Sequence, residues 1–338
     1  MPNITMQQIA DMAGVSLKTV SRVVNKESGV KQSTREKIEA LVEKYDFQPN
    51  PSARGLASSR SYLIGLLYKN PSASYIIGLQ DGALAACRAH KYGLLIHPCD
   101  HEDPGVVDAV NQLARHSRVD GLLLTPPLCD MEPLLEMLDK RKLKYVRISP
   151  LEHNDRSPFV FADEEQAAFR MTEYLLSQGH MRVGFITGAV NRSGTEMRLA
   201  GYRKSLANHK IDCDDSLIIE GDYSYESGEM AARKLLRSDN RPTAIFASND
   251  YMASGVLKVA AQMGIRVPHD LSVAGYDDAP LAQRLWPRLT TIHHHVEQMT
   301  QYAAEILIRH LNDGETEFDP ESIYSELIVR ESTAPLLR

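Results

Sequence analysis

The chain has 338 residues, of which 43% are hydrophobic, so it exceeds one typical domain and can bury a large core. Its formal net charge is −6, but residues 1–60 carry nine Lys and Arg against six Asp and Glu, which leaves −9 for the remainder. This basic surplus would concentrate attraction for phosphate at one end, but it is too small to establish nucleic-acid binding. No run approaches the ~18 apolar residues of a membrane span, and the N-terminus has no secretion-signal pattern, so we expect a cytoplasmic protein without membrane contact.

Residues 5–25 have the pattern of a helix-turn-helix. Thr5 and Gln8 form a capping box that begins a first helix, and Gly14 supplies the left-handed residue that ends it. Ser16 can cap a second helix, whose N-terminal outer face is exposed and rich in hydrogen-bond donors. An ordinary pair of packed helices is the alternative, but it does not explain that face. The candidate DNA contacts of this region are Thr5, Ser16, Leu17, Lys18, Thr19, Ser21, Arg22 and Asn25.

A third helix is expected to complete an all-α headpiece over residues 1–48. Ser33 and Glu36 form a second capping box in front of apolar residues at helical spacing. Two prolines then interrupt the chain within residues 49–60. The helical stretch that this segment could form is too short to be stable alone, so it should become ordered only against a partner.

The chain resembles the lactose-repressor/galactose-repressor (LacI/GalR) family of bacterial transcriptional regulators. The stretches that carry the resemblance are IADMAGVSLKTVSRVVN, VKQSTREKIEALVEKYDFQPNPSARGLA, VDGLLL, GHMRVGFITG, RLAGY, SNDYMASG, DLSVAGYDD and RLTTIHH. They occur in the family's order over nearly the whole length, so the resemblance is specific. It implies a hinge helix over residues 49–60 that binds the minor groove with Ala53, Arg54 and Leu56, the leucine wedging between base pairs. Packing of Leu56 on the rest of the protein is the alternative.

From residue 61 onward, short apolar runs alternate with longer amphipathic stretches. The predicted strands are 62–68, 93–97, 121–125, 145–148 and 159–161, followed by 183–187, 217–219, 244–247 and 271–274. The predicted helices between them include 76–90, 166–178, 197–208 and 252–263. Strands of about five residues separated by helices indicate βαβ units, so two such series predict an α/β body of two parallel-sheet lobes.

The resemblance implies a periplasmic-binding-protein-like body whose chain crosses between the lobes near residues 162, 290 and 322. The N-terminal lobe would then contain residues 61–161 plus 291–321. The C-terminal lobe would contain residues 162–290 plus 322–338.

Polar residues follow several predicted strands, at the edge where open parallel sheets bind ligands. A carboxylate at Asp277, an amide at Asn249 and a guanidinium at Arg198 would suit a ligand with many hydroxyl groups. In the family, positions matching these three bind a sugar or another small effector, and Tyr223 and Phe161 match aromatic positions of that pocket. The alternatives are helix caps for Asn249 and Asp278, and a surface salt bridge for Arg198. The full candidate set for effector binding is Ser74, Tyr75, His101, Arg147, Phe161, Arg198, Tyr223, Asn249, Asp277 and His294.

The chain departs from the family pattern at two of these positions. His294 stands where the family usually has a glutamine, and Arg147 replaces a hydroxyl-binding carboxylate of some members. Together with His101 and Arg192 they predict a cationic pocket that would suit a phosphorylated or acidic sugar, although a surface position would explain Arg192 equally well. Two histidines of the run 293–295 share a strand face, but without a placed carboxylate they make a weak zinc site, and no metal is expected.

Catalytic patterns are missing from the sequence. It has no glycine-rich dinucleotide or P-loop motif, the adjacent acids Asp277 and Asp278 lack a partner for glycoside hydrolysis, and the four cysteines have no CxxC spacing. We therefore expect no enzyme and no cofactor, and reduced thiols.

The resulting prediction is a dimeric, ligand-controlled repressor that binds a palindromic operator through two headpieces. A solute-binding protein of the same body plan is the alternative, disfavoured by the headpiece and the missing export signal. A dimer is expected rather than a tetramer because the tail around Pro335 has no leucine heptads, and the helix after Ser74 could contribute to the dimer contact.

Overall fold

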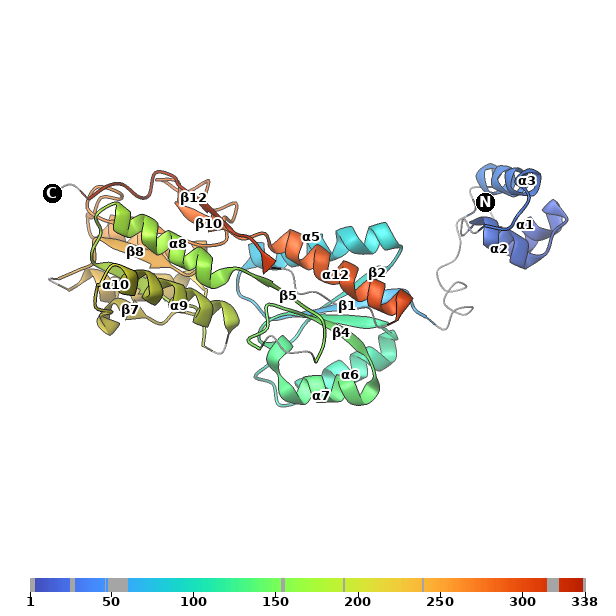
Figure 1. Ribbon diagram of the computed structural model, residues 1–338, viewed down its shortest axis with the longest axis horizontal. Coiled ribbons are helices and arrows are strands. Elements are labelled where there is room, and N and C mark those ends of the chain that lie inside the picture. Colours follow the sequence, from blue (N-terminus) through green and yellow to red (C-terminus); the bar gives the residue numbers. More distant parts are fainter. Residues whose placement is uncertain are drawn as a thin grey trace. The chain divides into compact units, whose positions relative to one another are not determined.

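The computed structural model describes residues 4–24, 28–45, 47, 60–152, 156–190, 192–238, 240–314 and 322–336. The chain forms two compact units, Met1–Tyr62 and Leu63–Arg338 (Figure 1). Among the described residues, no helix combines the length and the apolar character that crossing a membrane requires.

The first unit is a bundle of three helices: α1 (Met6–Ala13), α2 (Leu17–Val24) and α3 (Gln32–Lys44). The predicted capping box of Thr5 and Gln8 is present, and Gly14 ends α1 with a left-handed φ of 69°. All three helices contribute to one small apolar core, formed by Ile9, Ala10, Ala13, Val20, Val23, Ile38 and Phe47. This arrangement is the predicted all-α headpiece.

The second predicted capping box is wrong. Helix α3 begins at Gln32, so Ser33 already lies within the helix, and the N-cap residue is Lys31, which has no capping side-chain bond. The carbonyl of Lys31 accepts hydrogen bonds from the backbone of Thr34 and Arg35, so the first turn begins two residues earlier than a Ser33 cap requires. Glu36 instead accepts a 2.9 Å hydrogen bond from the Gln32 amide.

The first lobe of the second unit is built on a six-stranded parallel sheet. Its strand order is β11-β5-β4-β3-β1-β2. The bounds are β1 (Leu63–Tyr68), β2 (Gly93–Pro98), β3 (Gly121–Leu124), β4 (Lys144–Ile148), β5 (Phe159–Ala162) and β11 (Ser322–Ile323). Helices α5 (Ala73–His90) and α12 (Val296–Asp313) cover one face, and α6 (Val106–Ser117) and α7 (Glu132–Arg141) the other (Figure 1). Because both faces are covered, β1 and β3 are almost continuously apolar and buried.

The second lobe repeats this plan around a four-stranded parallel sheet of order β7-β6-β8-β9. Its strands are β6 (Val183–Ile186), β7 (Ile218–Ile219), β8 (Ala244–Ala247) and β9 (Ser272–Ala274). Its helices are α8 (Glu164–Ser177), α9 (Ser193–Asn208), α10 (Tyr225–Leu236) and α11 (Asp250–Gln262). The predicted strand over 217–219 is shorter than expected, because residues 215–217 form a turn of 3₁₀ helix.

The chain passes between the two sheets at three places. It leaves the first sheet after β5, returns after β10 (Thr291–His293) to form α12, and leaves again after β11 to form β12 (Glu326–Ile328). Strands β10 and β12 pair with each other in antiparallel fashion beside the second lobe. The pairing of β11 with β5 keeps residues 322–323 on the first sheet, whereas the sequence assigned residue 322 to the C-terminal lobe.

Candidate functional site

The headpiece exposes one face of α2, from its first turn to its last. The side chains of Leu17, Lys18 and Arg22 are exposed, and Leu17 is a large apolar residue of which 46% is exposed. The hydroxyl of Ser16 accepts a 3.2 Å hydrogen bond from the backbone of Thr19 and lies 2.9 Å from the Thr19 hydroxyl. The capping residues therefore fix the start of α2, and Leu17 and Lys18 beside them are exposed to solvent.

The other predicted DNA contacts divide into two groups. Thr5 accepts a 3.2 Å hydrogen bond from the backbone of Gln8, and Ser21 is half-buried on α2. Asn25, Ala53, Arg54 and Leu56 lie outside the described residues, as does the predicted hinge up to residue 59.

Three adjoining cavities lie between the lobes of the second unit. The inner chamber, of about 50 Å³, is lined by Asn70, Ser72, Tyr75, Pro126, Ser149, Glu164, Arg192, Ser193, Gly194, Arg198, Tyr223, Asn249, Asp277 and His294. The outer chamber, of about 330 Å³, shares Tyr75, Asp277 and His294 with it and adds Ser74, Gly78, Asp278, Ala279, Pro280, His293 and residues 295–298 and 301. The side chamber, of about 130 Å³, includes Phe161 and Met197 and shares Ser149, Glu164 and Ser193 with the inner chamber. Eight of the ten predicted effector residues therefore line these chambers.

Arg198 and Glu164 form a buried ion pair at the inner chamber. The Arg198 Nε and Glu164 Oε2 atoms are 2.5 Å apart, and both side chains are less than a tenth exposed. Arg198 also donates to the carbonyl of Ser248, and its guanidinium lies 3.5 Å from the centre of the Tyr276 ring. Burial opposes ionisation of Glu164, but the charge of Arg198 outweighs it and holds the pKa of this carboxyl below its ordinary value. The alternative of a surface salt bridge for Arg198 is wrong.

The sequence interpretation missed Glu164. It follows the carboxyl end of β5, where ligands of parallel sheets bind, and this rule could have identified it. Its partner Arg198 lies 34 residues further on, in another helix, so spacing gave no sign of the pair.

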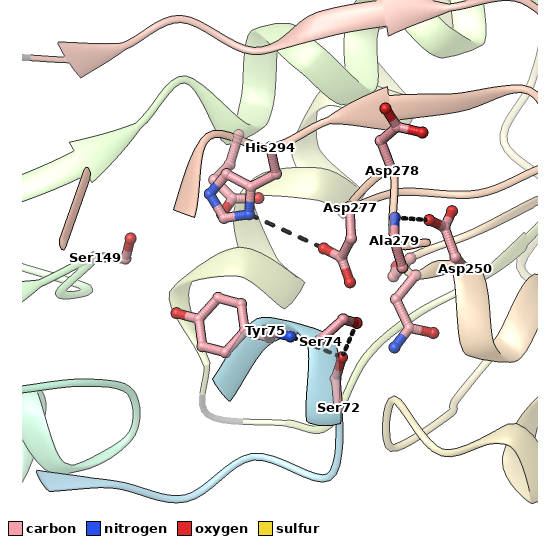
Figure 2. A network of polar contacts seen from close by, with 12 residues as sticks. Ser72, Ser74, Tyr75, Ser149, Asp250, Asp277, Asp278, Ala279 and His294 are labelled. Atoms are coloured by element: carbon pink, nitrogen blue, oxygen red, sulfur yellow. Dashed lines mark hydrogen bonds and ion pairs between the residues drawn. The ribbon is translucent and has the colours of Figure 1, made fainter. Parts of the chain in front are cut away.

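His294 lies between the carboxyl groups of Asp277 and Glu164, and its contact with Asp277 is drawn in Figure 2. Its Nδ1 is 3.9 Å from Asp277 Oδ1, and its Nε2 is 3.8 Å from Glu164 Oε1. The ring stacks on Tyr75, with 6.3 Å between the centroids. Its side chain is only 2% exposed, and neither ring nitrogen has a hydrogen-bond partner among the described residues.

Burial shifts the protonation of both groups in this pair. It lowers the pKa of His294 to about 4, and it raises the pKa of Asp277 to about 7. At neutral pH the imidazole is therefore uncharged, so one of its nitrogens can donate a hydrogen bond to a ligand and the other can accept one.

Asp250 holds the loop that carries Asp277. This fully buried carboxyl group accepts a hydrogen bond from the Thr291 hydroxyl at 2.6 Å. It accepts another from the Ala279 backbone at 2.7 Å (Figure 2). Asp277 itself has a positive φ of 110°, and its backbone N–H donates to Ile292 at 2.9 Å. These bonds stabilise the strained backbone that directs the Asp277 carboxyl into the cavity.

The helix-cap interpretation of Asn249 is confirmed. Its Oδ1 accepts a 2.8 Å hydrogen bond from the backbone of Met252, and its Nδ2 donates to the Tyr223 carbonyl at 2.9 Å. Asn249 thus lines the inner chamber chiefly as a wall residue. The same interpretation is wrong for Asp278, which binds Arg330 at 2.6 Å and His293 at 3.1 Å.

Two predicted effector residues are not brought to these chambers. Arg147 is buried beneath the β4–β5 connection, where it donates to Ser157 Oγ at 3.0 Å and to the Glu152 carbonyl at 3.1 Å. His101 follows β2, outside the three linings. The structure therefore does not form the cationic pocket that the sequence predicted, because Glu164 and Asp277 accompany Arg192 and Arg198 in the inner chamber.

Arg192 and its neighbour Ser193 connect the two lobes. Arg192 Nη1 donates to the carbonyls of Lys69, at 3.0 Å, and Pro126, at 3.1 Å, which follow β1 and β3. The Ser193 hydroxyl donates to the carbonyl of Ser149, which follows β4, at 2.5 Å. These bonds from the start of α9 hold the lobes together over the inner chamber. The surface position considered for Arg192 is therefore wrong, since only 9% of the residue is exposed.

The histidine run has no metal-site geometry. His293 and His295 contact each other edge to face, with 4.3 Å between their ring centroids. Over the described ranges, no group of three or more His, Cys, Asp or Glu side chains is arranged to hold a metal ion.

Comparison with known proteins gives matches along the whole chain. The family model described as "Bacterial regulatory proteins, lacI family" matches residues 5–50, and a periplasmic binding protein-like domain matches residues 172–333. Catabolite control protein A of Priestia megaterium is 31% identical over 332 residues, covering 98% of this chain and 99% of that protein.

Two solved structures have the same organisation. The lac repressor dimer bound to operator and the anti-inducer ONPF has a TM-score of 0.80 at 26% identity, covering 98% of this chain and 99% of that one. The complex of the transcriptional regulator CelR with cellobiose has a TM-score of 0.74 at 28% identity, covering 97% of this chain and 99% of that one.

Proposed function

The chain belongs to the LacI family of bacterial transcriptional repressors, and we propose that it represses carbohydrate-utilisation genes by binding a palindromic operator as a dimer. We infer that a sugar or sugar-phosphate effector releases it from this operator. Its site of action would be the cytoplasm, where the DNA is.

One observation carries this proposal: a headpiece with an exposed, donor-rich α2 precedes a body with a polar interlobe cavity. Lys18 and Arg22 are suited to guanine O6 and N7 in the major groove. The cavity presents two guanidinium groups, two carboxyl groups and an imidazole, a set that binds hydroxyl groups directionally. Sugar ligands are also supported by the cellobiose bound to the related CelR regulator.

The effector would act through the angle between the lobes. A ligand in the inner chamber must separate or reorient the groups that hold Arg192 and Ser193, because the chamber has only about 50 Å³ in this closed arrangement. Such a ligand changes operator affinity only if it binds the non-DNA conformation more tightly. The residues before Tyr62 would pass this change to the headpieces.

In vitro selection of DNA with the full-length protein tests the operator part of the proposal. We expect enrichment of a two-fold symmetric site, to which the protein binds with affinity that falls as salt rises. A chain of residues 61–338 is the comparison, since a solute-binding protein of this body plan would keep its function without the headpiece. Enrichment of asymmetric sites, or of none, contradicts a palindrome-binding repressor.

A screen by differential scanning fluorimetry tests the effector part. Sugars and sugar phosphates are added to the full-length protein, and each stabilising compound is then tested for release of the selected operator in a gel-shift assay. Asp277→Ala serves as the cavity variant, which should bind operator normally and ignore the effector. An unchanged effector response in that variant would contradict the assignment of the cavity.

A further inference from the structure

The outer chamber is much larger than the inner one, and this difference bears on the size of the ligand. Small-molecule sites generally occupy about 300–1,000 Å³. Among the three chambers, only the outer one reaches this range, at about 330 Å³, whereas the inner chamber has about 50 Å³. A single sugar ring in the inner chamber would leave the larger space unused.

The wall between the inner and outer chambers is made of groups that suit a saccharide. Tyr75, Asp277 and His294 line both spaces, and the flat ring of Tyr75 can pack against the apolar face of a sugar. Both nitrogens of the buried His294 lack hydrogen-bond partners in the described structure. A buried polar group without a partner is costly, and hydroxyl groups of a ligand that crosses the wall would satisfy it.

The charges of the outer chamber disfavour an anion. Its described lining contains Asp277, Asp278 and Glu297 but no lysine or arginine. The start of α12, which could otherwise attract a phosphate, already carries Glu297 in its first turn. The amide side chains of Gln298 and Gln301 complete a surface that offers both donors and acceptors.

We propose that the outer chamber is a second subsite of the effector site and that the effector is a neutral, two-ring saccharide, with one ring in each chamber and His294 contacting both. This inference rests on the proposed sugar-regulated function and narrows its effector to disaccharides without phosphate. Ser74 and Gly78 of α5 and Gln298 of α12 form the far wall of the second subsite.

The test is isothermal titration calorimetry with the full-length protein and matched sugars. The probes are cellobiose, maltose, lactose, sucrose and trehalose, together with glucose, galactose, fructose and glucose 6-phosphate. We expect one of the disaccharides to bind about tenfold or more tightly than either of its monosaccharides, as one or two added net hydrogen bonds provide. Glucose 6-phosphate should bind no more tightly than glucose.

Two tryptophan variants localise the second subsite. Gln298→Trp fills the outer chamber from an exposed position, so it should lower the affinity for the disaccharide to that for its monosaccharides. Gln112→Trp, at an exposed glutamine of α6 outside the chamber linings, is the matched control and should bind as the wild type does.

The possible outcomes distinguish failure of the second subsite from failure of the proposed sugar-regulated function. Monosaccharides that release the operator as effectively as disaccharides would leave the proposed function standing and overturn the second subsite. Tighter binding of glucose 6-phosphate than of glucose would overturn the neutral ligand. If no saccharide binds a protein that still binds its operator, the sugar effector itself is wrong, and the two-ring ligand with it.

Discussion

Because Arg198 is buried, we expect its substitution to lower the stability of the fold. Because Arg198→Ala would leave Glu164 buried without its cationic partner, we expect the free energy of unfolding to fall by about 3–5 kcal/mol. The double variant Arg198→Met/Glu164→Leu removes both charges and should recover most of this loss. Urea denaturation of the three proteins measures it. A single variant as stable as the wild type would show that the pair is not buried in solution.

The Asp277–His294 pair predicts opposing pH effects on stability. Folding raises the pKa of Asp277 from 3.8 to about 7, so its contribution to stability falls as the pH rises through that window. Folding lowers the pKa of His294 from 6.5 to about 4, so its contribution rises with pH over that range. As the pH rises from about 4.5 to 6.5, the stability of Asp277→Asn relative to the wild type should therefore increase. Over the same rise, the stability of His294→Gln relative to the wild type should decrease.

Urea midpoints across this range measure both changes. Each slope is limited to about 1.4 kcal/mol per pH unit, the value for one proton. Parallel profiles of the wild type and both variants would show that neither group titrates with a shifted pKa.

We expect α2 to be the helix of the headpiece that contacts the DNA bases. Arg22→Ala should weaken binding to the selected operator by about 1–3 kcal/mol and binding to random DNA much less, because a base contact is specific to sequence. Fluorescence anisotropy with both DNAs gives the two values. An equal loss on both would mean that Arg22 contacts only phosphate.

Close packing of helices at glycine occurs in both lobes. An added Cβ at Gly82 of α5 would lie 2.1 Å from the Glu297 carbonyl of α12, and one at Gly201 of α9 would lie 2.1 Å from the Glu165 carbonyl of α8. We therefore expect Gly82→Ala to push α5 from α12 and to cost about 1–3 kcal/mol of stability.

Gly78 provides a matched control on the same helix. A Cβ at Gly78 would lie 3.3 Å from Cβ and Cγ1 of Val296, a much milder contact than the 2.1 Å at Gly82. The higher helix propensity of alanine should offset this contact, so Gly78→Ala should be nearly neutral. Equal losses for both variants, measured by thermal unfolding, would contradict the close-packing argument.

Most elements could be predicted from local signals, whereas several contacts could not. The strands β1, β3 and β8 are uninterrupted apolar runs. The caps at Thr5 and Asn249 follow from residue types at the start of a helix and from bonds to residues close by in the sequence. The direction of Arg147 depends on the path of the β4–β5 connection, which local sequence does not specify. The binding of Arg192 to carbonyls after β1 and β3 depends on the closure of the lobes. Such contacts arise only from the tertiary arrangement.

At the scale of the molecule, two lobes of one plan are linked by three chain crossings and attached to a separate headpiece unit. If the proposed effector lowers operator affinity by a given factor, thermodynamic linkage requires the operator to lower effector affinity by the same factor. Titration of the effector with and without operator measures this factor from both sides.

A palindromic operator predicts a two-fold symmetric dimer. Sedimentation equilibrium at micromolar protein should therefore give twice the 37.8 kDa mass of the chain. Ile77 on α5 is 56% exposed and is our candidate dimer contact, so Ile77→Arg should weaken the dimer. Met181→Arg, at a similarly exposed apolar residue between α8 and β6, should not. A stable species of four times the chain mass would contradict the dimer.

The bonds of Arg192 and Ser193 have an evolutionary consequence. Their acceptors at Lys69, Pro126 and Ser149 are main-chain carbonyl oxygens, which every amino acid possesses. Mutational drift at those three positions therefore leaves closure of the lobes intact wherever the backbone path is preserved. The donors have no such protection, because their hydrogen bonds come from the side chains themselves. Descendants of this gene can thus vary the residues facing Arg192 and retain the closed body, but a single codon change at position 192 removes two of the three bonds at once.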